Sequence, residues 1–278
     1  MKPLNFILLS LFCLSANCFG DIIPTNDFKV IEECVNKADK DTLVIFDVDD
    51  VLVMPTDEFA FNAPVRKEIF NKQLLKDKYS EDELKYLFSP MFKVRNVKLV
   101  ATQMPNLIKD LEQRKIWTIA LTKWWTGKYG NIDKMEDLRF TGLTQVGISF
   151  INTSPFKEDG TFPEFENKNG IPMLKSGIIL TASANKGLVL KAALEKYNLH
   201  FKKIIFIDDT MKELESVEKA FLDMNIDFQG IHYGAAKIAP LPILDKEKEE
   251  LRYEILEKEH IWLLDKELEE RIRKNSKK

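Results

Sequence analysis

The chain has 278 residues, of which 45% are hydrophobic and 31% are charged, and its formal net charge is −3 at pH 7. This length supports a sizeable core, built either as one domain with an insertion or as two domains. The composition excludes a disordered chain, and the slightly acidic balance without a basic patch argues against non-specific nucleic-acid binding.

The first twenty residues predict a secretory signal peptide. Lys2 precedes an apolar run over residues 6–14, and small residues follow at positions 18 and 20. The run is too short to span a bilayer comfortably, and Asn17 before Cys18 suits a lipoprotein cleavage site poorly. We therefore expect residues 1–20 to be cleaved, and the mature protein to be periplasmic or secreted without a stable membrane anchor.

An amphipathic helix over residues 26–39 and a buried strand open the mature chain. Leu43 to Phe46 are continuously apolar, as in a strand covered on both faces inside a parallel sheet. Asp47, Asp49 and Asp50 follow, and carboxylates clustered at a buried strand end are costly unless a cation or a shared proton relieves their repulsion. An acidic turn is the alternative, but ligands of open parallel sheets lie outside such strand ends.

The stretch before the next sheet strand is about sixty residues long, more than an ordinary connection needs. Asn62-Ala63-Pro64 offers a helix cap followed by proline in a first turn. Ser80 to Glu83 form a capping-box pattern that opens another helix, which we expect to break at Ser89-Pro90. We therefore assign residues 55–100 to a small helical cap above the site.

Two more buried strands bring polar residues toward the same edge of the sheet. A helix over residues 104–114 leads into the apolar run 116–122, which ends in Thr122. Lys203 to Ile207 form another apolar run, and Asp208-Asp209 end it. The pattern of the first strand is therefore repeated.

Hairpins and a helix are expected between these strands. Asp159-Gly160 and Asn169-Gly170 predict a β-hairpin insertion near residues 150–181, taken as a small accessory sheet. Lys186 lies in the first turn of a helix that runs to about Tyr197, where a cation is unfavourable unless an anion compensates it, although lysine is common at such positions.

The remaining elements alternate helix and strand. A helix over residues 213–224 precedes a strand over residues 228–233, and one long charged helix is expected from Leu244 to about Arg273. The charges of this last helix predict a solvated face with local ion pairs.

The polar residues at these strand and helix ends follow the order Asp-x-Asp, Thr, Lys, Asp-Asp. In this order and spacing, the sequence resembles the haloacid dehalogenase-like phosphohydrolase superfamily, and it is most similar to a poorly characterised group of secreted bacterial members. Asp50 departs from the glycine or small residue that is common at its position, and Val51 replaces the commonest threonine. The matching motifs are Asp47-Val48-Asp49-Asp50-Val51-Leu52, Thr122, Lys186 and Asp208-Asp209.

The resemblance implies an α/β fold with a Rossmann-like parallel sheet flanked by helices. Residues 21–54 and 101–278 would form this core, and residues 55–100 the helical cap. It also implies an exported Mg²⁺-dependent phosphatase that hydrolyses a small phosphomonoester through an aspartyl-phosphate intermediate.

By the same resemblance, four residues take part in catalysis. Asp47 attacks phosphorus, and Asp49 protonates the leaving group and then activates the hydrolytic water. Thr122 donates a hydrogen bond to the phosphoryl group, and Lys186 compensates its charge. Lys123, beside Trp124 and Trp125, is a further candidate for substrate binding, with core packing as the equal alternative for the two tryptophans.

The metal site implied by the resemblance uses oxygen ligands. Mg²⁺ would bind Asp47, the main-chain carbonyl of Asp49, and Asp208, with Asp209 in support. The three histidines lack ligand spacing, so zinc is not expected.

Two other functions use similar residues. A phosphate-binding or interaction protein could keep the fold and lose turnover, which the departure at Asp50 and the poorly characterised group both allow. A phosphoaccepting receiver domain also uses clustered aspartates, threonine and lysine, but the export signal and the double aspartate on the last strand argue against it.

Overall fold

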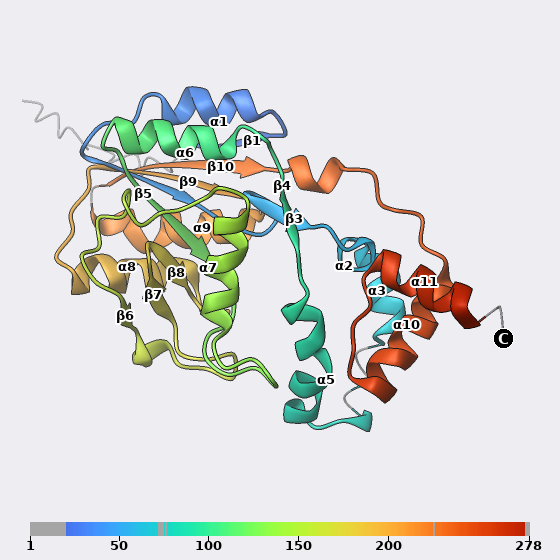
Figure 1. Cartoon of the computed structure of the whole chain (residues 1–278). Coiled ribbons are helices and arrows are strands. Elements are labelled where there is room, and N and C mark those ends of the chain that lie inside the picture. Colours follow the sequence, from blue (N-terminus) through green and yellow to red (C-terminus); the bar gives the residue numbers. More distant parts are fainter. Residues whose placement is uncertain (1–20, 72–74, 76, 225, 276–278) are drawn as a thin grey trace, which may run out of the picture.

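The computed structural model describes residues 21–275 except 72–74, 76 and 225, so the predicted leader lies outside the described residues. Helices cover both faces of a central sheet, and a separate layer of helices stands beside it (Figure 1). None of the described helices is long and apolar enough to cross a membrane.

Within the described residues, eight strands form the central sheet in the order β1-β10-β9-β2-β5-β8-β7-β6. The pairings from β1 through β8 are all parallel, which confirms the predicted α/β class with a mostly parallel sheet. The bounds are β1 Asp21–Thr25, β2 Thr42–Phe46, β5 Trp117–Thr122, β6 Gly160–Thr161, β7 Met173–Lys175, β8 Ile178–Leu180, β9 Lys203–Asp208 and β10 Asp227–Tyr233.

The hairpin insertion extends the main sheet, and the prediction of a separate accessory sheet is wrong. β8 pairs parallel with β5, and β7 and β6 continue the sheet in antiparallel pairs. The turn between β7 and β8 contains Ser176 and Gly177, both with positive φ. Asn169-Gly170 instead belongs to a tight turn, closed by reciprocal hydrogen bonds between Asn167 and Gly170.

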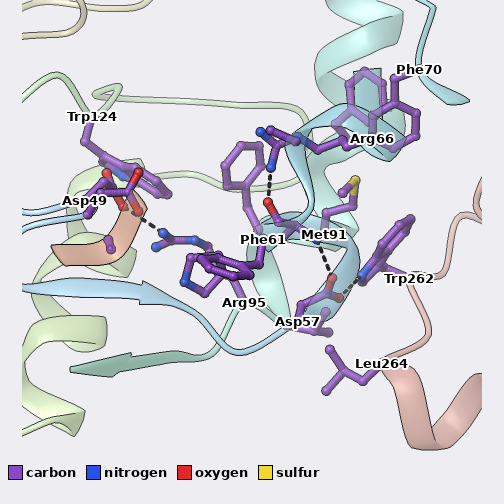
Figure 2. A pocket seen from close by; sticks show the side chains of 18 of the residues that line it. Asp49, Asp57, Phe61, Arg66, Phe70, Met91, Arg95, Trp124, Trp262 and Leu264 are labelled. Carbon is purple, nitrogen blue, oxygen red and sulfur yellow. Dashed lines mark hydrogen bonds and ion pairs between the residues drawn. The ribbon is translucent and has the colours of Figure 1, made fainter. Parts of the chain in front are cut away.

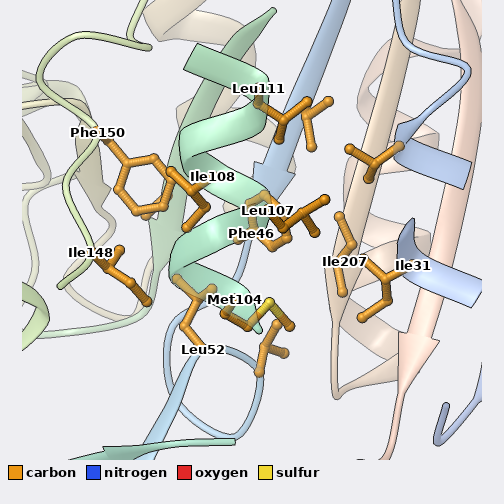
Figure 3. Close-up of a cluster of buried hydrophobic side chains, with 14 of the residues drawn as sticks. Ile31, Phe46, Leu52, Met104, Leu107, Ile108, Leu111, Ile148, Phe150 and Ile207 are labelled. Carbon is orange, nitrogen blue, oxygen red and sulfur yellow. The ribbon is translucent and has the colours of Figure 1, made fainter. Parts of the chain in front are cut away.

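The two faces of the sheet pack on different helices because successive side chains of a strand point to opposite sides. Val44 and Phe46 belong to the cluster under α1 and α6, in which Phe46 lies close to the residues of α6 (Figure 3). Leu43 and Ile45 belong to the other cluster, under α8 and α9. The continuously apolar β2 is therefore buried on both faces, as its sequence predicts. The helix bounds are α1 Phe28–Val35, α6 Met104–Gln113, α7 Met135–Gln145, α8 Lys186–Lys196 and α9 Met211–Phe221.

The helical layer beside the sheet is built from two distant parts of the chain. Phe59 and Leu87, from residues 55–100, share an apolar cluster with Leu256 and Trp262. The C-terminal helices therefore pack with the predicted cap, whereas the sequence assigns them to the core. The helices of this layer are α2 Glu58–Phe61, α3 Ala63–Ile69, α5 Glu81–Lys93, α10 Lys246–Glu259 and α11 Asp265–Asn275.

A two-stranded antiparallel ribbon connects the layer to the sheet. It consists of β3 Val53–Pro55 and β4 Val97–Leu99, and its strands flank the segment that holds α2, α3 and α5. Three short 3-10 helices complete the described elements, Pro163–Phe165, Leu222–Met224 and Ala235–Ile238.

Candidate active site

The site is built at the carboxyl ends of two neighbouring strands. In the parallel pair of β2 and β9, Phe46 lies opposite Ile207, and the backbone N–H of Asp47 donates to the Ile207 carbonyl at 2.8 Å. Asp47 and Asp208 therefore follow at the same level of the sheet. Both are buried, with 7% and 1% of their surfaces exposed.

Lys186 joins these two carboxylates. Its Nζ lies 2.6 Å from Oδ1 of Asp47 and 2.7 Å from Oδ2 of Asp208, and the lysine is itself buried. Burial lowers the pKa of Lys186, but the two carboxylates outweigh it and raise that pKa above its usual value. Burial has the opposite effect on Asp47, whose pKa it raises above the usual value, and Lys186 opposes this increase. A lysine at the start of a helix requires a compensating anion, and here two carboxylates, Asp47 and Asp208, supply it.

Close helix packing positions Lys186. Asn185 caps α8 by accepting from the backbone N–H of Leu188 at 2.9 Å. A Cβ atom at Gly187 would lie 2.1 Å from the carbonyl oxygen of Ser216 in α9, so only glycine allows this approach of the two helices. The sequence places α8 correctly, but the role of Gly187 depends on a neighbour about thirty residues away.

Three carboxylates of the described chain meet closely enough to hold a cation. One oxygen each from Asp47, Asp208 and Asp209 lie within 4.8 Å of one another. Asp209 also pairs with Lys237, whose Nζ lies 2.9 Å from Oδ2. Carboxylate oxygens are the donors that Mg²⁺ prefers, so this set fits a hard divalent cation.

Asp49 is held apart from that group by two arginines. Arg95 contacts Oδ1 of Asp49 at 2.7 Å, and Arg139 binds both carboxylate oxygens. Both guanidinium groups also lie over the ring of Trp124, at 5.1 and 4.0 Å from its centre. Desolvation raises the pKa of Asp49, but the two arginines outweigh it and bring the pKa below its usual range.

Of the other predicted site residues, Thr122 lies near Asp47, whereas Lys123 points away from the site. Thr122 ends β5 beside β2 and is buried at the same edge of the sheet as Asp47. Lys123 points instead to α9, where its Nζ lies 2.6 Å from Oε1 of Glu213. Lys123 is absent from the lining of the cavity described below, whereas Trp124 and Trp125 are both part of that lining.

Asp50 occupies a turn that explains its departure from the common motif. Its φ of 63° is left-handed, and its N–H donates to the Val53 carbonyl at 2.8 Å. Glycine, asparagine and aspartate are the residues that adopt this conformation most easily. Desolvation, Asp209 and Asp49 raise the pKa of Asp50, in this order of size.

A cavity of about 570 Å³ lies between the carboxylate site and the helical layer. Asp49, Asp50 and Arg95 line the end at the site, and Arg66 and Trp262 lie at the helical layer (Figure 2). The aromatic side chains of the lining are Phe61, Phe70, Phe88, Phe92, Trp124, Trp125, Tyr129 and Trp262.

The arginines near the site are not predicted from the sequence. Arg95 follows α5, Arg139 lies within α7, and Arg66 lies within α3. None of them has a spacing that relates it to the aspartate motifs. Only the burial of Arg139, at 3% exposure within a helix, distinguishes it, and burial is a property of the folded chain.

The chain is similar to proteins of Rickettsia. An uncharacterized protein of Rickettsia prowazekii is 26% identical over 247 residues, which cover 86% of this chain and 88% of that protein. An uncharacterized protein of Rickettsia bellii is 24% identical over 257 residues, 82% of each chain. No solved structure gives a significant match. The family described as "Protein of unknown function (DUF2608)" matches residues 24–269, which is most of the chain, so this protein belongs to that family.

Proposed function

We propose that this protein is an exported Mg²⁺-dependent phosphatase of the haloacid dehalogenase-like type, acting on a small phosphomonoester. The observation that carries the proposal is the buried contact of Lys186 with Asp47 and Asp208, with Asp209 alongside, at the carboxyl edge of a parallel sheet. Ligands of such sheets bind at this edge. A nucleophile, a fixed cation and a set of metal ligands are thereby supplied by one cluster.

In the proposed reaction, the Asp47 carboxylate attacks phosphorus, the bond from phosphorus to the leaving oxygen breaks, and the protonated carboxyl of Asp49 gives its proton to that oxygen. Water then gives a proton to the Asp49 carboxylate and attacks the aspartyl-phosphate, which releases inorganic phosphate and regenerates Asp47. Lys186 faces Asp47 at 2.6 Å and would hold the phosphoryl oxygens by charge, while Thr122 donates a hydrogen bond. When bound by Asp47, Asp208 and Asp209, Mg²⁺ would neutralise further charge on the phosphoryl oxygens.

The experiment is a phosphatase assay with an aryl phosphate and a panel of phosphometabolites, with and without Mg²⁺. Asp47→Asn removes the nucleophile with little change in volume, so turnover should fall to background while the melting temperature is preserved. Asp41→Asn changes a partly exposed carboxylate that pairs with Lys202 at 2.7 Å, and as the matched control it should leave turnover unchanged. Hydrolysis that survives in Asp47→Asn would overturn the mechanism.

The ion pairs of Asp49 favour a second candidate function. A general acid must carry a proton when the leaving group departs, but Arg95 and Arg139 hold Asp49 in its ionised form. A protein that binds phosphate esters and turns them over slowly, or not at all, would have this arrangement. Saturable binding of an aryl phosphate that is recovered intact after prolonged incubation with Mg²⁺ would establish this alternative.

Export is part of the proposal and rests on the sequence. The described fold begins with β1 at Asp21, so removal of residues 1–20 takes away none of the described helices or strands. The intact mass of the protein recovered from outside the cytoplasm of a bacterial host should correspond to a chain that begins at Asp21. Recovery of the full-length chain in the cytoplasm alone would contradict export.

A further inference from the structure

The cavity beside the site is larger and more apolar than a phosphoryl group requires. Its volume of about 570 Å³ is in the range of sites for organic ligands. It lies beside the carboxylate cluster, because Asp49, Asp50 and Lys237 line it and Lys237 pairs with Asp209. A phosphorylated ligand bound at the carboxylates would therefore extend its organic part into this space.

The walls of the cavity favour a flat apolar body. Phe92 is the centre of one wall, with its ring 5.5 Å from Trp124, 5.6 Å from Trp125 and 5.2 Å from Tyr129. Trp125 and Tyr129 are stacked, 4.7 Å apart and inclined by 22°. Because these two rings already face one another, a flat aromatic ligand would contact the outer faces and edges of the ring cluster, in offset or edge-on geometry.

Arg66 places a positive charge in this apolar wall. Its guanidinium donates to the carbonyl of Ala60, and it forms no ion pair with any described residue (Figure 2). Arg95 and Arg139, by contrast, are both paired with Asp49. Desolvation lowers the pKa of Arg66, and the more distant Asp50 and Asp57 oppose this only in part.

Asp57 does not pair with Arg66, because its oxygens are directed to other donors. They accept from Trp262 Nε1 at 2.8 Å and from the backbone N–H of Ala60 at 2.8 Å, and Arg252 lies 3.5 Å away. Arg66 is partly exposed, and a guanidinium has five N–H donors, so an anion can accept the donors that the Ala60 carbonyl leaves open. The open side of Arg66 is the cavity, so that anion would come from a ligand.

We propose that the substrate is a phosphomonoester with an aromatic or similarly flat apolar body and a second anionic group, which Arg66 binds. This inference rests on the proposed phosphatase function, which sets the orientation of the bound substrate. The phosphoryl group would lie at Asp47 and the second anion at the helical layer. Two sources share the required chemistry, a carboxylate and a second phosphate. Both accept the paired hydrogen bonds that a guanidinium donates.

The test measures binding in the Asp47→Asn variant with Mg²⁺, so that it does not depend on turnover. The probes are phenyl and 2-naphthyl phosphate, their counterparts with a carboxylate at the far end of the ring system, and the matching naphthalene bisphosphate. Dissociation constants come from calorimetry and from the fluorescence of the tryptophans that line the cavity. The doubly anionic probes should bind roughly tenfold more tightly than their parents.

Arg66→Gln in the same background should remove this advantage and lower the affinity for the parent compounds far less, while Arg66→Lys should keep part of the advantage. Lys67→Gln is the matched control, since Lys67 is exposed on the same helix and does not line the cavity. It should change neither class of affinity. Melting temperatures of all three variants show whether the bond to Ala60 is needed for folding, and the lysine variant keeps the test valid if the glutamine variant unfolds.

Equal affinities for singly and doubly anionic probes, or an advantage that persists in Arg66→Gln, would overturn the proposal. A preference for the bisphosphate over the carboxylates would identify the second group as phosphate, and the reverse preference as carboxylate. If the wild-type protein hydrolyses none of the probes but the Arg66-dependent preference remains, the phosphatase function fails and the anion site stands. If the wild-type protein hydrolyses the probes but shows no Arg66-dependent preference, the phosphatase function stands and the anion site fails.

Discussion

Lys186 shows how one side chain stabilises two buried carboxylates at once. Replacing it with methionine leaves Asp47 and Asp208 in a buried place without their shared cation. Removing one partner of a buried ion pair costs roughly 3–5 kcal/mol of folding free energy, because the remaining charge has no compensation. We expect Lys186→Met to lose at least about 3 kcal/mol in urea unfolding at neutral pH without metal.

Added Mg²⁺ should restore part of that loss, because it supplies positive charge to the same carboxylates. The control is Lys202→Met, which removes an exposed lysine paired with Asp41 and should change stability by less than about 0.5 kcal/mol. A Lys186→Met protein as stable as the wild type in the absence of metal would contradict the role given to the lysine.

Asp208 and Asp209 differ in what their loss should do to metal binding. Asp208 is 1% exposed and accepts from Lys186 and from the backbone N–H of Thr210, whereas Asp209 is less buried and pairs with the exposed Lys237. Asp208→Asn should therefore weaken Mg²⁺ binding by tenfold or more in calorimetry, and Asp209→Asn by less. Asp227→Asn, an exposed carboxylate on β10, should leave the affinity unchanged. If Asp209→Asn has the larger effect, the two aspartates exchange roles.

At the scale of residues, the sequence predicts the carboxylates but not the arginines. Asp47, Asp208 and Asp209 follow apolar runs that can only be buried strands, and parallel strands bring their carboxyl ends to one edge. Arg66 and Arg95 reach the cavity from the predicted cap, and no local pattern encodes how the cap packs on the sheet.

In α5, the predicted capping box is present, but the proline that was expected to end the helix does not end it. Ser80 and Glu83 form the predicted capping box at the start of α5. The predicted break at Ser89-Pro90 is wrong, since α5 continues to Lys93. Proline cannot donate to the carbonyl of Tyr86, but the Ser89 hydroxyl does so at 2.8 Å, and the helix therefore continues.

The single long helix expected at the C-terminus is divided into two. His260 adopts a left-handed conformation with φ 55° and ends α10, and Trp262 follows in the link to α11. No glycine or proline marks this position in the sequence. The burial of Trp262 under Phe59 is a tertiary contact that explains the break and lies beyond the reach of helix periodicity.

A buried charge cluster at the start of α10 makes the helical layer sensitive to pH. Arg252 is surrounded by Asp57, Glu249 and Asp265, so negative charge exceeds positive. Burial raises the pKa of Glu249 to about 7, and Asp265 adds to this while Arg252 opposes it. The folded state therefore binds a proton on Glu249 more tightly than the unfolded state does. Protonated Glu249 stabilises the fold at low pH, and this stabilisation is lost as the pH rises through about 7.

Glu249→Gln should therefore stabilise the protein at pH 8 by about 1–3 kcal/mol relative to wild type, and give no gain at pH 4.5. Urea unfolding at the two pH values measures the difference. Glu250→Gln, which changes the exposed neighbouring residue, should be neutral at both. A gain that is equal at both pH values would mean that the proton on Glu249 does not distinguish the folded from the unfolded state.

At the scale of the whole molecule, the sheet and the helical layer have separate apolar clusters. Trp262 belongs to the cluster of the helical layer, where its ring lies 5.2 Å from that of Phe59. Trp262→Ala should speed hydrogen exchange in α2, α5 and α10 but leave β2 and β9 protected. Trp117→Ala, which changes a tryptophan 39% exposed on β5, is the control and should leave the helical layer unchanged. Uniform loss of protection would show that the two layers unfold together.

The origin of the helical layer in two segments has a consequence for the order of events during synthesis. Phe59 and Leu87 leave the ribosome early, but Leu256 and Trp262, which cover them, come after every strand of the sheet. The apolar surface of the N-terminal segment therefore stays exposed until the C-terminal residues that cover it have been synthesised. The carboxylate cluster is complete once β9 and Asp209 have been made, whereas the lining of the cavity is complete only with Trp262 and Leu264. A nascent chain therefore acquires the charged site first and the enclosure last.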